Sequence, residues 1–135
     1  MADLDTVDPP AEPRVWSTPL PREPTAVPLA RHEVRARLSD WELRCIAPKA
    51  ELVVSELVAN VIRHGEFPAE LRVAWRGRRV RVEVVDASPA RPVERARNPT
   101  ERGGFGLPIV GAVAESWGFM PSPTGKVVWA ELPLG

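Results

Sequence analysis

Three polar residues interrupt an otherwise apolar segment between about residues 48 and 64. Glu56, Asn60 and His64 follow one another at intervals of four, so they share one face of a predicted helix. The other positions of the segment are apolar nearly all round, which is typical of a buried helix. Burying a carboxylate and an amide is costly unless both find partners. The polar face therefore either meets complementary side chains or lines a cavity.

A bound Mg²⁺ ion would account for this polar face. The amide oxygen of Asn60 is a ligand of the kind that Mg²⁺ accepts, and the ion usually keeps several waters. Glu56 could orient or deprotonate a water or an attacking hydroxyl. Alternatively, Glu56 and Asn60 cap loops or pair with arginines, and His64 by itself is more typical of a helix-end cap or a packed histidine. The helix alone does not decide between these interpretations.

A second polar signal follows the predicted strand 80–85. Asp86 comes directly after this strand and could accept a hydrogen bond from an exocyclic amine, which suits adenine. It could equally cap the turn at Ser88-Pro89, as aspartate often does. The irregular stretch that follows, residues 87–102, is long for a compact domain, and such loops are usually functional or disordered.

A glycine cluster, residues 103–106, opens a predicted helix at 106–116. Glycines let the backbone approach a phosphate closely, and a helix N-terminus adds partial positive charge. The same glycines could instead only form a tight turn. The cluster by itself is a weak indication of phosphate binding.

The elements that must position these residues alternate between helices and hairpins. Apolar periodicity and turn residues predict an edge strand at 15–18, stopped by Pro19, and three helices at 25–41, 48–64 and 106–116. They also predict a central hairpin at 71–85 and a closing hairpin at 117–132. This order favours an α+β two-layer sandwich: a mixed, mostly antiparallel sheet with about three helices on one face. Acidic residues and prolines predict a disordered tail over 1–13, leaving a single domain over 14–135.

Composition limits the classes of function. The chain has 135 residues, is 44% hydrophobic and has a formal net charge of zero, which argues against direct binding to nucleic acid. The basic run Arg72–Arg81 is interpreted as a solvated face, with protein docking as the alternative. The single cysteine, Cys45, excludes an internal disulfide and is expected to be a small buried hydrophobe. With neither a signal peptide nor an apolar run of about 20 residues, we expect a cytoplasmic protein that does not enter a membrane.

Taken together, the motifs resemble those of the GHKL ATPases, the superfamily of gyrase, Hsp90, histidine kinases and MutL. The segment 51–65 resembles the first nucleotide motif, and Asp86-Ala-Ser88 resembles a degenerate Asp-x-Gly motif. The segment 103–110 is similar to the second glycine motif, and 125–129 ends the match. The resemblance covers about residues 25–133. It is closest to the anti-sigma-factor serine kinase branch of small stand-alone actinobacterial regulators.

This resemblance implies a Bergerat fold that binds ATP and Mg²⁺. Asn60 would hold the Mg²⁺ ion, Glu56 would be the general base, and Asp86 would read the adenine amino group. The other nucleotide-binding positions implied by the resemblance are Arg63, His64, Ser88, Gly103, Gly104, Phe105, Gly106 and Leu107. Two departures are notable. Ser88 replaces a glycine that approaches adenine, and Val127-Val128 stands where other branches often carry a threonine.

The function implied is that of a protein serine/threonine kinase, which would transfer the γ-phosphate of ATP to a serine of a small antagonist protein. Such transfer depends mainly on positioning and charge neutralisation. The alternative is a non-catalytic, ATP-gated module that sequesters a sigma factor or another regulator. A histidine-kinase fragment is disfavoured, because His32 and His64 are the only histidines and no long coiled coil precedes them. Members of this branch often dimerise, so the resemblance also allows a homodimer.

Overall fold

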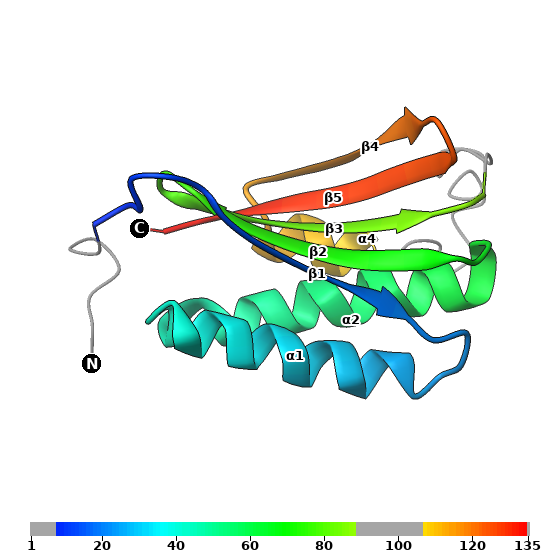
Figure 1. Cartoon of the computed structure of the whole chain (residues 1–135), viewed down its shortest axis with the longest axis horizontal. Helices are drawn as coiled ribbons and strands as arrows, with labels where there is room; N and C mark the ends of the chain where they lie inside the picture. The colour runs from blue at the N-terminus through cyan, green and yellow to red at the C-terminus, as the bar shows by residue number, and fades with distance from the viewer. Residues whose placement is uncertain (1–7, 89–106, 135) are drawn as a thin grey trace.

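The computed structural model describes residues 8–88 and 107–134, with the side chains of 107–109 excepted. It consists of two layers, a five-stranded sheet and helices packed against one face of it (Figure 1). The α+β sandwich predicted from the sequence is confirmed. Every pair of neighbouring strands in the described sheet is antiparallel.

The sheet has the strand order β1-β2-β3-β5-β4. The strands are β1 (Arg14–Leu20), β2 (Ala69–Arg76), β3 (Arg79–Asp86), β4 (Ser116–Ser122) and β5 (Gly125–Pro133). The helices are α1 (Ala26–Asp40), α2 (Ala47–His64) and α4 (Leu107–Val113), with a 3₁₀ turn, η2 (Arg44–Ile46), before α2. Because β3 pairs with β5, the central hairpin and the closing hairpin form one continuous sheet.

Two local expectations are wrong. Pro19 does not stop the first strand, which continues to Leu20. An edge strand has one row of backbone groups without a neighbouring strand, so a residue lacking an N–H is tolerated there. Cys45 is exposed rather than buried, because the short turn η2 directs Ile46 into the core. Of the predicted tail, only residues 8–13 are described, and they carry no helix or strand.

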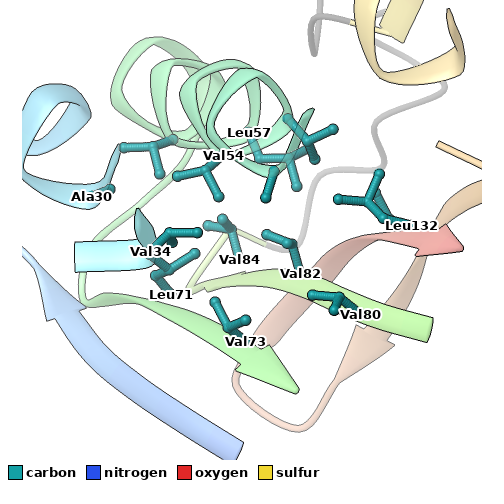
Figure 2. Close-up of a cluster of buried hydrophobic side chains, with 14 of the residues drawn as sticks. Ala30, Val34, Val54, Leu57, Leu71, Val73, Val80, Val82, Val84 and Leu132 are labelled. Atoms are coloured by element: carbon teal, nitrogen blue, oxygen red, sulfur yellow. The ribbon is translucent and has the colours of Figure 1, made fainter. Parts of the chain in front are cut away.

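The core lies between the helices and the inner face of the sheet (Figure 2). Strand β3 alternates strictly, so its even-numbered residues from Val80 to Val84 point to the helices while its odd-numbered residues point away. Val54 and Leu57 of α2 and Val34 of α1 cover this row of valines. No described helix is both long and apolar enough to cross a membrane.

The outer face of the sheet carries the basic run, and its charges are largely paired. Arg72 contacts Glu70, and this hydrogen bond raises the pKa of the guanidinium above its ordinary value. Arg81 contacts Glu83 at 2.7 Å and lies over the ring of Trp129, with 4.3 Å between its guanidinium carbon and the ring centroid. The basic side chains of this face are therefore largely matched by acids of the same face.

Two leucines of α2 provide a matched test of the packing. Leu57 is 2% exposed and Leu52 is 41% exposed. We expect Leu57→Ala to lower the free energy of unfolding by about 2–5 kcal/mol, because it leaves a cavity against the sheet. Leu52→Ala should change it by about 0.5 kcal/mol or less. Urea unfolding followed by circular dichroism measures both, and equal losses would contradict the described orientation of α2.

Candidate functional site

Three chain segments meet at one end of the sheet. Helix α2 ends at His64, β3 ends at Asp86, and β5 begins at Gly125, all toward the right of Figure 1. The amide of Ala87 donates a 2.8 Å hydrogen bond to the carbonyl of Glu66, which ties the end of β3 to the segment after α2. Gly65 makes this exit possible, since a Cβ at this position would collide with the side chain of Val61.

The polar face of α2 contains one buried side chain, Asn60, and two half-buried ones, Glu56 and His64. Asn60 is 4% exposed, and Glu56 lies one helical turn before it at intermediate exposure. In the described part of the chain, Glu56 forms neither an ion pair nor a hydrogen bond. A carboxylate in this setting is free to accept a proton or to orient a ligand.

The arginines of α1 contact a different carboxylate. Arg35 donates to both oxygens of the buried Glu51, with 3.1 Å between its Nε and Oε2. Arg31 approaches the same carboxylate at 3.9 Å. The hydrogen bond from Arg35 to Glu51 raises the pKa of the guanidinium above its ordinary value. Glu51 is therefore the structural acid of α2, and the arginine-pairing alternative does not describe Glu56.

Arg63 and His64 form the last turn of α2, at the same end of the molecule as Asp86. Arg63 is exposed and His64 is half-buried. Basic side chains at a helix C-terminus interact favourably with the helix dipole, so a helix-end role for His64 accounts for its position. The same position keeps both residues close to the end of β3 in the fold.

Asp86 ends the inner row of β3 with a charge. The positions before it on this face are buried valines. The Asp86 side chain is equally buried, at 3% exposure, but it is charged and faces Lys126 of β5. The Nζ atom of Lys126 lies 3.0 Å from Oδ2 and 3.1 Å from Oδ1 of Asp86. The Lys126 side chain is also 3% exposed. A buried pair of this kind is strongly destabilised when one partner is lost, because the other charge remains buried.

Asp86 also accepts a 2.6 Å hydrogen bond from the backbone N–H of Ser88 to Oδ1, and Ser88 is itself buried. The turn-capping alternative considered for Asp86 therefore occurs in the structure. This contact does not exclude a ligand, since it uses only one oxygen of the carboxylate.

Lys126 is the site residue that the sequence did not reveal. It lies 40 residues from Asp86 in the chain, and only the pairing of β3 with β5 makes the two residues direct partners. The available signal was a lysine at the start of a mostly apolar strand. Without the strand order, its acidic partner could not be assigned.

Gly125 fixes this juxtaposition. A Cβ at this position would collide with the carbonyl oxygen of Asp86 and come within 2.7 Å of the backbone of Ala87. Strand β5 can therefore begin against the end of β3 only with glycine here.

The predicted glycine cluster, with Gly103, Gly104, Phe105 and Gly106, lies outside the described residues. Leu107 begins α4, but its side chain is not among those described. The described part of the site thus comprises the polar face of α2, its last turn, and the Asp86–Lys126 pair.

Substitution of Gly125 tests the contact between β3 and β5. We expect Gly125→Ala to lower the free energy of unfolding by roughly 1–3 kcal/mol, because the strands must separate to admit the methyl group. Gly111→Ala is the matched control. Its Cβ would lie 3.6 Å from the nearest side-chain atom, and alanine favours a helix. Thermal unfolding of the two variants should separate them, and a Gly125→Ala variant as stable as the control would contradict this packing.

Two comparisons with known proteins bear on the family to which the chain belongs. No curated protein matches the chain. The family model described as a histidine kinase-like ATPase domain matches residues 20–132, which include every described helix and, except for the last residue of β5, all strands after β1. This match spans most of the chain and contains all the residues of the candidate site. The chain therefore belongs to the family of histidine kinase-like ATPase domains.

Proposed function

We propose that this protein is an ATP-dependent serine/threonine kinase of the anti-sigma-factor type, acting on a serine of a small antagonist protein. Family membership supports ATP binding. The observation that carries the kinase proposal is Glu56, a half-buried carboxylate without a described partner, one turn before the buried Asn60. A protein that only bound nucleotide would have no need of an acid at this position.

The donor set on α2 fits Mg²⁺ bound together with a nucleotide. Asn60 offers an amide oxygen, a suitable ligand for this hard cation. The described residues contain no cluster of three or more His, Cys, Asp or Glu side chains that could hold a metal by themselves. Few protein ligands are expected where phosphates and waters complete the coordination. When bound, the ion would neutralise charge on the phosphates.

The proposed transfer needs one proton acceptor. Glu56 accepts the proton of the attacking serine hydroxyl as the bond from its oxygen to the γ-phosphorus forms. The bond between that phosphorus and the β–γ bridging oxygen breaks, and ADP leaves. Asp86, beside Ser88, holds the adenine amino group. Arg63 and His64 lie toward the phosphates, which would be wrapped by the segment containing Gly103, Gly104, Phe105, Gly106 and Leu107.

Asn60 tests the metal part of the proposal. We expect Asn60→Ala to weaken ATP binding about tenfold in the presence of Mg²⁺ and to have little effect without it, because the lost interaction is with the ion. Asn60→Asp keeps an oxygen ligand and should retain the Mg²⁺ dependence. Calorimetric titration with ATP and ADP, with and without Mg²⁺, measures both. The proposal of a nucleotide site fails if the unmodified protein binds neither nucleotide in any of these conditions.

Glu56 tests the catalytic part. Glu56→Gln keeps the shape of the side chain but cannot accept the proton, so phosphate transfer should fall about a hundredfold or more while ATP affinity is retained. The assay uses γ-labelled ATP, Mg²⁺ and a nucleotide-depleted extract of the source cells, with new phosphoserines identified by mass spectrometry. Glu66→Gln, which changes an exposed acid just beyond α2, is the control.

The expected result is a small protein phosphorylated on serine by the unmodified protein and the Glu66→Gln control, but not by Glu56→Gln. If the unmodified protein binds ATP but gives the same phosphoserines as Glu56→Gln, the kinase proposal is overturned. The chain would then act as a nucleotide-gated binding module.

A further inference from the structure

We propose that Lys126 determines which purine this site accepts, by occupying acceptor positions of Asp86 so that a single position remains for the base. This inference rests on the nucleotide site proposed above. It assigns a specificity role to a residue of β5 that is neither on α2 nor in the glycine cluster.

The geometry of the pair defines what Asp86 can still bind. An ionised carboxylate has two oxygens with about four acceptor positions in total. Oδ1 receives the Lys126 ammonium at 3.1 Å and the Ser88 amide at 2.6 Å. Oδ2 receives the ammonium alone, at 3.0 Å, among the described residues. Two donors therefore fill Oδ1, and one acceptor position remains on Oδ2.

One acceptor position suits adenine and not guanine. Adenine presents a single exocyclic amine on its Watson–Crick edge, which needs one acceptor. Guanine presents its N1–H and its 2-amino group side by side, and these match a carboxylate only when both oxygens are available. A site with one available oxygen leaves one guanine donor unpaired, and unpaired buried donors are strongly disfavoured.

The surrounding backbone keeps Lys126 in place. The register of β3 and β5 makes Asp86 and Lys126 direct partners, and Gly125 allows close contact between the two backbones. On the other side of Asp86, β2 contributes the small, buried Ala69. With both charged groups almost completely shielded from solvent, water does not compete for the ammonium.

Comparing three nucleotides tests the inference in the unmodified protein. Inosine triphosphate has the N1–H and 6-oxo group of GTP but lacks the 2-amino group. If Oδ1 is filled, the 2-amino group of GTP is buried without a partner, so GTP should bind more weakly than both ATP and inosine triphosphate. Binding of GTP about tenfold tighter than inosine triphosphate would show that both oxygens are available, and would overturn the inference.

Removing the ammonium should change this pattern. We expect Lys126→Met to reduce the ratio of ATP to GTP affinity about tenfold or more, and to create a preference for GTP over inosine triphosphate. Lys49→Met is the matched control, because Lys49 is exposed and is the only other lysine in the chain. If Lys126 had a purely structural role, Lys126→Met would weaken the binding of all three nucleotides equally and leave the ratios of their affinities unchanged.

The outcomes separate this inference from the function on which it rests. If the unmodified protein binds no nucleotide, the proposed function fails, and the inference fails with it. If it binds ATP but a folded Lys126→Met variant keeps the unmodified ratios, only the role of Lys126 is refuted. If Lys126→Met does not fold, the comparison of GTP with inosine triphosphate in the unmodified protein still decides.

Discussion

The antiparallel pairing of β3 with β5 is the contact on which the rest of the structure depends. It joins two hairpins that are separated by a long stretch of chain, and it completes the apolar surface on which α2 packs. The same register that aligns buried valines in the middle of these strands aligns a carboxylate with an ammonium at their end. Core and site are therefore consequences of one alignment, in which a slip by one residue would turn both sets of side chains outward.

Local features of this fold could be predicted from the sequence, but contacts between distant segments could not. The apolar periodicity of 48–64 and the alternation of 80–85 gave α2 and β3 almost to the residue, because each pattern is complete within its own element. The partners of Glu51 and Asp86 required knowledge of which elements are neighbours. Cys45 was misassigned for the same reason, since its exposure depends on how one short turn meets the core. The roles assigned to the glycine cluster stay predictions.

The two acids of α2 lie in different surroundings. Glu51 is buried and contacts arginines of α1, whereas Glu56 has no partner among the described residues. The positions differ by five residues, which turns the two carboxylates to different sides of the helix. Arginines pair with Glu51, while Glu56 keeps its carboxylate without a partner among the described residues. Proteins commonly keep such an unfavourable local arrangement at functional sites.

The burial of Lys126 also gives the chain an unusual pattern of amine reactivity. Of its two lysine side chains, one is exposed on α2 and the other is shielded in an ion pair. An acylating dye should therefore modify the Lys49 side chain readily and that of Lys126 hardly at all. Modification of Lys126 would therefore report opening of the end of the sheet where α2, β3 and β5 meet. This measurement needs no added cofactor.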